Sequence, residues 1–200
     1  MYGVTCKQCR RLGQSVCGRE KCALRRRPYR PGQHGKGRIR VSEFGKQLTE
    51  KQKLKLLYGV RERQFQNYFK QASNAPEPTG EALVRSLEMR LDNVVFRLGF
   101  ATTRSQARQL VSHGHFTVNG RRTTIPSYRV RVKDRITFRP QSKDKSAFKE
   151  LPTTLKKYEP PHWMALDKEA FAGEITALPS ADITRDVPVE VAQIVEYYSR

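Results

Sequence analysis

Four cysteines lie within the first 22 residues of the chain, and thiolates are ligands that zinc prefers in closed structural sites. They are Cys6, Cys9, Cys17 and Cys22, in the spacing C-x2-C-x7-C-x4-C. A tetrahedral zinc ion needs four ligands at about 2.3 Å from one point. The pattern predicts a structural zinc site, because four thiolates leave no open position for a substrate.

Two disulfides, an iron–sulfur cluster and four unligated thiols are the alternatives for these cysteines. Residues 1–30 are rich in Cys, Arg and Lys and contain no apolar stretch typical of a secretion signal, which argues against disulfides. Nothing in the pattern points to redox chemistry. The segment has few large apolar residues beyond Leu12, Val16 and Leu24, so a metal would supply cohesion that a core cannot.

The chain of 200 residues is strongly basic, with 39 Lys and Arg against 19 Asp and Glu and a net charge of +20. Residues 1–46 carry +11 and residues 47–149 carry +13, whereas residues 150–200 carry −4. This excess predicts a polyanionic partner, most plausibly nucleic acid, although any single Lys or Arg is as easily a solvated surface residue. No apolar run approaches the roughly 20 residues of a membrane-spanning helix, which excludes a membrane protein.

A basic segment, residues 25–38, follows the cysteines and contains two prolines and three glycines. This composition predicts an extended arm that can follow a phosphate backbone closely; a disordered basic linker is the alternative. His34 is not expected to bind the metal, because four cysteines already close the site. The candidate nucleic-acid-binding residues of the arm are Arg25, Arg26, Arg27, Arg30, His34, Lys36 and Arg38.

Three helices are expected after the arm. A capping-box pattern at Thr49 and Gln52 begins the first, which ends at Gly59. An apolar stripe over residues 65–72 marks the second, and its aromatic residues are interpreted as core. The third is a long helix over residues 81–98 with one apolar face.

A small α+β module is expected next. Thr103 and Gln106 form a second capping box, and Asn119-Gly120 is a strong two-residue hairpin signal. Alternation over residues 128–138 predicts half-buried strands with one basic face and a turn near Lys133. The outward cations of this module are candidate contacts: Arg104 and Arg108 on the helix, Arg129 and Arg131 on the strand.

The acidic tail is expected to form a short helix after Asp167, an extended stretch over residues 176–179 and a last helix opened by Pro188. We interpret it as a cover that packs on the helical part of the chain. A docking site for a basic neighbouring protein is the alternative.

The sequence between residues 90 and 128 closely resembles an RNA-binding module that is named after the fourth ribosomal protein of the small subunit. The matching residues are Arg90-Leu91-Asp92, Arg97-Leu98-Gly99-Phe100-Ala101, Arg104, Ala107-Arg108-Gln109-Leu110-Val111-Ser112-His113-Gly114-His115, Val118-Asn119-Gly120 and Ile125-Pro126-Ser127-Tyr128. The module also occurs in pseudouridine synthases and some tRNA synthetases, so alone it indicates RNA binding. Similarity to the ribosomal family itself extends to Arg27-Pro28-Tyr29, Pro31-Gly32-Gln33-His34-Gly35 and the terminal residues 194–199.

The resemblance implies a bacterial-type or organellar structural protein, without enzymatic activity, in the cytoplasmic 30S subunit. It implies binding to the 5′ domain of small-subunit ribosomal RNA at a junction of several helices, early in 30S assembly. It further implies contacts with neighbouring small-subunit proteins, notably the fifth, and a place near the channel through which messenger RNA enters, with an influence on decoding accuracy. The residues that match the family's RNA-facing surface are Arg90, Arg97, Arg104, Arg108, His113 and His115.

Some members of the family bind zinc through four cysteines with a longer gap between the second and third, and others lack the cysteines. That variation implies a metal that serves local folding and not RNA recognition.

Two other functions are weighed against this interpretation. An RNA-modifying enzyme with the same module would need a catalytic domain of well over 100 residues, and the flanking segments here are short and basic. A zinc-dependent DNA-binding regulator would need a recognition helix or a dimerisation heptad, and neither stands out. The sequence contains no G-x-S-x-G, P-loop or H-E-x-x-H motif.

The sequence thus predicts an α+β protein with a mainly helical body, an inserted small α+β RNA-binding module of two short helices and an antiparallel sheet, and an N-terminal zinc-binding extension. The expected division is residues 1–45 (zinc and arm), 46–89 (helical domain, covered by the tail), 90–149 (RNA-binding module) and 150–200 (acidic tail).

Overall fold

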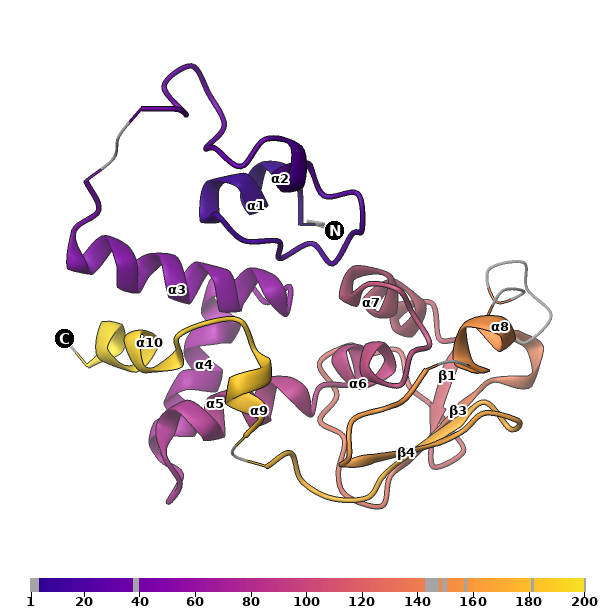
Figure 1. Cartoon of the computed structure of the whole chain (residues 1–200). Coiled ribbons are helices and arrows are strands. Elements are labelled where there is room, and N and C mark those ends of the chain that lie inside the picture. Colours follow the sequence, from indigo (N-terminus) through magenta and orange to yellow (C-terminus); the bar gives the residue numbers. More distant parts are fainter. Residues whose placement is uncertain are drawn as a thin grey trace. The chain divides into compact units, whose positions relative to one another are not determined.

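The computed structural model describes residues 4–37, 40–142, 148, 151–156, 158–180 and 182–199. The chain divides into two compact units, each with its own packing (Figure 1). The helical unit comprises residues 1–84 and 181–200, and the sheet unit comprises residues 85–180. Arg38 lies outside the described residues.

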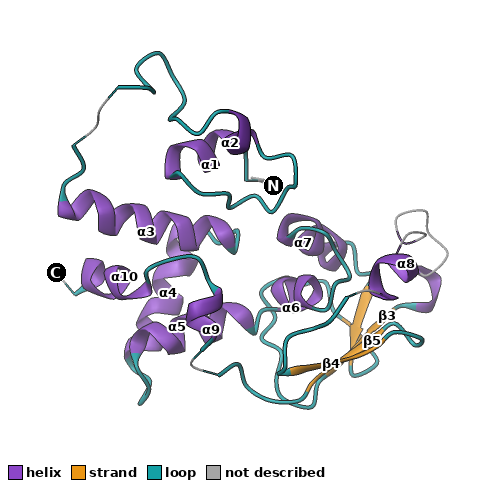
Figure 2. Ribbon diagram, viewed as in Figure 1, coloured by secondary structure: helices purple, strands orange, loops and turns teal. Residues whose placement is uncertain are grey.

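The helical unit consists of α-helices joined by loops (Figure 2). Its described helices are α1 (Cys6–Leu12), α2 (Ala23–Arg26), α3 (Glu43–Leu57), α4 (Glu62–Ser73), the first part of α5 (Thr79–Glu88), α9 (Ile183–Asp186) and α10 (Val191–Tyr198). Helix α10 packs on α3, and the Tyr198 ring stacks on Phe69 of α4 at a centroid distance of 4.3 Å. Phe65 of α4 is fully buried, so the aromatic stripe is core, as the sequence analysis predicts.

Helix α3 begins six residues before the predicted start at Thr49. The Ser42 hydroxyl caps it by accepting a hydrogen bond from the Gly45 N–H (3.2 Å), which satisfies a free donor of the first turn. The Thr49 hydroxyl instead donates to the Gly45 carbonyl (2.7 Å) from inside the helix. The predicted capping box is therefore wrong, whereas the end is right: α3 stops at Leu57 and Gly59 has φ +61°.

The long helix predicted over residues 81–98 is two helices, α5 and α6 (Leu91–Arg97). Between them Arg90 is extended, with ψ 139°. The Leu91 N–H donates to the Tyr128 carbonyl (2.9 Å) and the Val130 N–H donates to the Met89 carbonyl (2.9 Å). At this break between α5 and α6, hydrogen bonds to residues 128–130 replace the backbone hydrogen bonds of a continuous helix. The apolar face that suggested one helix nevertheless continues from α5 into α6.

The sheet unit packs helices beside one antiparallel sheet (Figure 1). Its described elements after α6 are α7 (Arg104–Ser112), β1 (Phe116–Val118), β2 (Arg121–Arg122), β3 (Arg135–Phe138), the 3₁₀ turn Pro140–Ser142, α8 (Leu151–Lys156), β4 (Met164–Asp167) and β5 (Ala172–Ile175). The strand order is β2-β1-β3-β5-β4. The rings of Phe100, Phe116 and Phe138 contact one another in its core, with centroids 4.6 to 5.9 Å apart.

Local signals in this unit are confirmed. Thr103 caps α7 by accepting from the Gln106 N–H (3.2 Å), and Asn119 (φ 50°) and Gly120 (φ 78°) form the turn between β1 and β2. Lys133 has φ 72° at the predicted turn. The α+β class and the antiparallel sheet are likewise confirmed.

The tail differs from its prediction over residues 150–180, which belong to the sheet unit; only its last part, residues 181–200, belongs to the helical unit. The helix predicted directly after Asp167 is absent: residues 168–171 form a turn, and strands β4 and β5 on either side of it form a hairpin that joins β3. The Asp167 carboxylate accepts hydrogen bonds from the Glu169 and Ala170 N–H groups (3.1 and 2.9 Å) and so closes a turn. An aspartate at the start of a helix makes similar bonds, so the two cases look alike in sequence. The last helix is present as α10.

Candidate nucleic-acid interface and cysteine cluster

The four cysteine side chains gather in the helical unit. The Sγ atoms of Cys6, Cys17 and Cys22 lie within 4.8 Å of one another. The Cys9 thiol, fully buried, forms a hydrogen bond with the Cys17 thiol. Cys6 and Cys9 lie on α1, and Cys17 and Cys22 lie on the loop before α2, as the two halves of the spacing require.

Two of these thiols have unusual acidity. Burial raises the pKa of Cys9 to about 12. Burial also disfavours the Cys22 thiolate, but hydrogen bonds from the Leu24 backbone and from Ser15, Cys17 and Cys9 outweigh it and lower the pKa of Cys22 to about 7. A cation at the centre of the cluster would favour the thiolate form of all four side chains.

The cluster has the donor set of a metal site. Sulfurs around a tetrahedral zinc ion lie about 3.8 Å apart, given zinc–sulfur bonds of about 2.3 Å, and the Sγ atoms of Cys6, Cys17 and Cys22 are close to that spacing. Around it the small core consists of Val4, Val16 and parts of Leu12 and Leu24. These cysteines could hold a metal ion.

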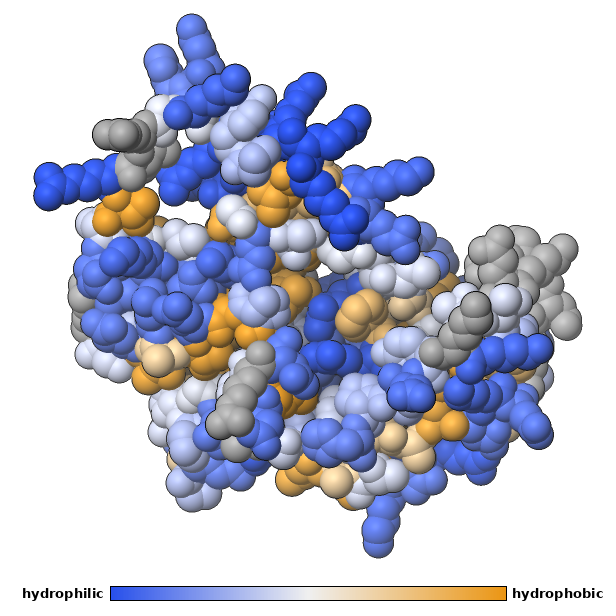
Figure 3. Space-filling model, viewed as in Figure 1, coloured by the Kyte–Doolittle hydropathy of each residue, from blue (hydrophilic) through white to orange (hydrophobic). Residues whose placement is uncertain are grey.

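The arm, described over residues 25–37, places its cations in solvent. Arg25, Arg26, Arg27, His34 and Lys36 are exposed and Arg30 is half-buried. Figure 3 shows hydrophilic side chains that project outward from this part of the chain. Its regular structure is limited to the single turn of α2, as the prolines and glycines predict.

Tyr29 anchors the arm to α1. The Arg10 guanidinium donates to the carbonyls of Tyr29 (3.0 Å) and Arg30 (3.3 Å). The same guanidinium lies 4.9 Å from the Tyr29 ring centroid, and the Lys36 ammonium lies 5.2 Å from it. One aromatic ring thus fixes the arm's path and leaves its arginines outward.

The sheet unit holds its cations differently, in a cluster that we name the carboxylate network: Glu88, Asp92, Asn93, Arg90, Arg97, Arg104 and Arg108. The Glu88 carboxylate is fully buried and accepts two hydrogen bonds from the Arg97 guanidinium (3.0 and 2.8 Å). It also accepts from the Asn93 amide (2.6 Å), whose oxygen accepts from Arg104 Nε (2.8 Å).

Asp92 forms the second half of the network. Its carboxylate accepts two hydrogen bonds from Arg90 (3.0 and 2.7 Å) and one from Arg108 (3.3 Å). Arg90 is 1% exposed, so its guanidinium serves the fold in this conformation. Arg97, Arg104 and Arg108 keep 20%, 20% and 30% of their side chains exposed, so each side chain is partly accessible to an anion.

The two histidines of the module also differ. His113 is exposed directly after α7. His115 is 8% exposed, its Nδ1 lies 3.0 Å from the Ser142 hydroxyl and its ring meets the Phe148 ring edge-on. Of these two histidines, His113 is therefore the one that lies at the surface.

Arg129 and Arg131 are exposed, but they lie in a loop before β3, so the strand predicted from residue 128 is wrong for residues 128–134 and right for Arg135–Phe138. Residues 129 and 130 bond instead to the break between α5 and α6, through the Arg90–Arg129 bridge and the Val130 N–H. Sequence reasoning did not single out Arg121 and Arg122 of β2, which are also exposed and line a pocket of about 640 Å³ with Tyr128. Two adjacent arginines after a hairpin turn were the available signal. Glu88 was also missed, although an acid inside an apolar helix face is a signal of a buried ion pair.

Two family descriptions cover most of the chain. Residues 1–88 match the family described as Ribosomal protein S4/S9 N-terminal domain, and residues 89–136 match the S4 domain. The chain belongs to the uS4 family of small-ribosomal-subunit proteins. The boundary between the two matches coincides with the end of α5.

Bacterial uS4 proteins resemble the chain over its whole length. Small ribosomal subunit protein uS4 of Desulforamulus reducens is 50% identical over 204 residues, which cover 99% of this chain and 98% of the relative. Those of Pelotomaculum thermopropionicum and Heliobacterium modesticaldum are 49% and 48% identical with the same coverage.

Family membership confirms the interpretation as a bacterial-type structural protein of the small ribosomal subunit and does not favour an enzyme. It also confirms binding to small-subunit ribosomal RNA, through the uS4 and S4 domains. Within the described residues, no helix is both long and apolar enough to cross a bilayer.

Proposed function

We propose that the chain binds the 5′ domain of small-subunit ribosomal RNA at a junction of several helices and organises early 30S assembly. The observation that carries this proposal is the presence of two separate sets of outward cations, one on the arm and one around the carboxylate network. A junction concentrates phosphates from different helices, and a protein with several cationic surfaces can neutralise them together.

The proposed contacts follow from exposure. Direct contacts come from Arg25, Arg26, Arg27, Arg30, His34, Lys36, Arg97, Arg104, Arg108, His113, Arg129 and Arg131, with Arg38 as a further candidate and Arg90 and His115 as support behind the surface. Duplex RNA presents phosphates and 2′-hydroxyls and hides its bases in a deep groove. Arginine suits phosphate because its guanidinium offers a planar fork of donors. We expect recognition mainly by the shape of the junction.

The family resemblance supports further proposals. The chain would act in the cytoplasm, contact neighbouring small-subunit proteins, notably the fifth, and lie near the channel through which messenger RNA enters. Its influence on decoding accuracy would act through those contacts. The division into residues 1–45, 46–89, 90–149 and 150–200 stays a prediction.

We further propose that Cys6, Cys9, Cys17 and Cys22 hold a structural zinc ion. The close approach of the Cys6, Cys17 and Cys22 sulfurs, with the Cys9 thiol hydrogen-bonded to Cys17, supports this, and the small core around them would gain stability from the metal. Atomic absorption on protein purified under reducing conditions, without chelator, should find one zinc per chain. Chelation should make residues 4–37 sensitive to protease and leave the sheet unit intact. Protein that contains no zinc under these conditions would contradict the proposal.

Hydroxyl-radical footprinting of the full chain on small-subunit ribosomal RNA tests the RNA proposal. Protection should concentrate at one multi-helix junction in the 5′ domain and persist against excess duplex DNA at fixed salt. Scattered protection, or equal competition by the DNA, would reduce the assignment to general polyanion binding.

A further inference from the structure

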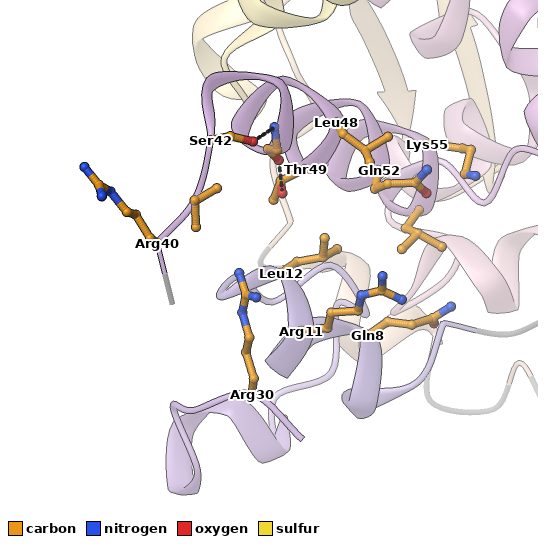
Figure 4. A pocket seen from close by; sticks show the side chains of 13 residues that line it. Gln8, Arg11, Leu12, Arg30, Arg40, Ser42, Leu48, Thr49, Gln52 and Lys55 are labelled. Atoms are coloured by element: carbon orange, nitrogen blue, oxygen red, sulfur yellow. Dashed lines mark hydrogen bonds between the residues drawn. The ribbon is translucent and has the colours of Figure 1, made fainter. Parts of the chain in front are cut away.

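A pocket of about 550 Å³ lies between α1, the arm and α3, all within the helical unit (Figure 4). Figure 4 shows Gln8, Arg11 and Leu12 on the α1 side and Leu48 and Gln52 on the α3 side. Arg30 reaches the pocket from the arm. Its volume is in the range of pockets that enclose small ligands.

Two cations of this pocket differ from Lys55 of its lining, whose ammonium is paired with the Glu62 carboxylate (2.8 Å). Among the described residues, no carboxylate lies within ion-pair distance of Arg11 or Arg30. The arginines of the carboxylate network, in contrast, are paired. Two unpaired guanidiniums at the edge of one pocket favour a negatively charged ligand such as a phosphate group.

The interior of the pocket is not suited to phosphate alone. Leu12 and Leu48 supply apolar surface, which a flat ring can cover. The Gln52 amide makes no hydrogen bond to any described residue, so both its donor and its acceptor are free. Gln8 has used its oxygen for the Thr5 N–H (2.8 Å), which leaves its amide N–H groups available.

We propose that this pocket takes one unstacked nucleotide of the bound RNA; the proposal rests on the function proposed above. The phosphate contacts Arg11 and Arg30, the base lies against Leu12 and Leu48, and the base edge pairs with the Gln52 amide. An amide suits this role because it offers a donor and an acceptor side by side. Unpaired bases are where proteins read RNA sequence, so this pocket adds a base-specific contact to recognition by shape.

The test is chemical probing of base-pairing edges in 5′-domain RNA bound to the full chain, to Gln52→Leu and to Gln66→Leu. Gln66 is an exposed glutamine on α4 outside the pocket and is the matched control. One unpaired nucleotide should be protected by the wild-type chain and by Gln66→Leu, and should become reactive with Gln52→Leu. The affinity of Gln52→Leu should fall about fivefold, the value of one hydrogen bond. Unchanged circular dichroism establishes that the variant is folded.

Identical protection by the wild-type chain and Gln52→Leu would overturn the pocket and leave the RNA function standing. Absence of RNA binding by the wild-type chain would overturn both. A third arm uses free nucleoside monophosphates in calorimetry. Binding of a free nucleotide that Gln52→Leu abolishes, together with an unchanged RNA footprint, would make the pocket a small-molecule site and would also overturn the proposal.

Discussion

The arginines of the arm and those of the carboxylate network carry the same charge but are held in different ways. Arg25, Arg26 and Arg27 are exposed and have no carboxylate partner among the described residues. Arg97 and Arg104 are fixed by a fully buried Glu88. The arginines of the arm therefore keep their full charge, and their side chains lose conformational freedom only when RNA binds. The arginines of the carboxylate network lose that conformational freedom when the protein folds.

This difference separates two tasks. Paired guanidiniums have part of their charge neutralised but stand in a fixed geometry, which suits recognition of one RNA shape. Exposed, unpaired guanidiniums adapt through their side chains to different phosphate positions and supply affinity that depends steeply on salt. One basic chain thus contains a rigid cationic surface and an adaptable one.

The largest expected effect is on the stability of the network. Glu88→Gln removes the negative charge and one of the two oxygens that accept from Arg97, and leaves this partly buried guanidinium without its counter-charge, so we expect a loss of about 3 kcal/mol of unfolding free energy. Trp163, the only tryptophan, is buried in the sheet unit, and its fluorescence during urea unfolding reports this loss. The matched control is Glu174→Gln on β5, which is exposed and should change stability by less than about 0.5 kcal/mol. Equal effects of the two substitutions would remove the distinction between the two kinds of arginine.

The second effect is on the arm's RNA affinity. Replacing Arg25, Arg26 and Arg27 by Gln should weaken binding about tenfold to a hundredfold at moderate salt and reduce the salt slope by about two to three units. The unfolding midpoint of the sheet unit should not move, because these side chains belong to the helical unit. A filter-binding titration over several salt concentrations measures both quantities. A shift in the unfolding midpoint of the sheet unit would show that the arm contributes to the stability of that unit.

The third substitution combines both effects. Arg104→Ala with Arg108→Ala should weaken RNA binding and flatten the salt slope by about two units, and should also lower stability by about 1 kcal/mol through loss of the pairs with Glu88 and Asp92. An unchanged affinity and slope at matched salt would contradict the placement of RNA on this face.

The smallest effect concerns a half-exposed carboxylate in the helical unit. Burial alone would raise the pKa of Glu62, but hydrogen bonds and charges from Lys51 and Lys55 outweigh it and lower the pKa below 4.5. Since the folded pKa is the lower one, the stabilisation is present above about pH 4.5 and is lost as the pH falls through the folded value. Wild-type protein should therefore lose slightly more stability than Glu62→Gln between pH 7 and pH 3, measured by urea unfolding. A steeper loss in Glu62→Gln would reverse the assigned sign.

The sequence predicted those features of the fold that depend on residues close together in the chain, such as turns and helix caps. Asn119-Gly120 sets its turn through its own backbone preferences, and Thr103 caps α7 through a contact three residues away. The break at Arg90 depends on residues 128–130, and the pocket depends on α1 lying beside α3, so neither could be found from local patterns. The cysteine gathering was foreseen from residue type and spacing, although its geometry was not.

Hydrogen exchange of the full chain, free and bound to 5′-domain RNA, tests most directly whether one cationic surface is preformed and the other adapts. Amides of residues 25–37 should exchange quickly in the free chain and become strongly protected by RNA. Amides of α6 and α7 should be protected already and change little. The same gain of protection in both regions, or a larger gain in α6 and α7, would contradict the account.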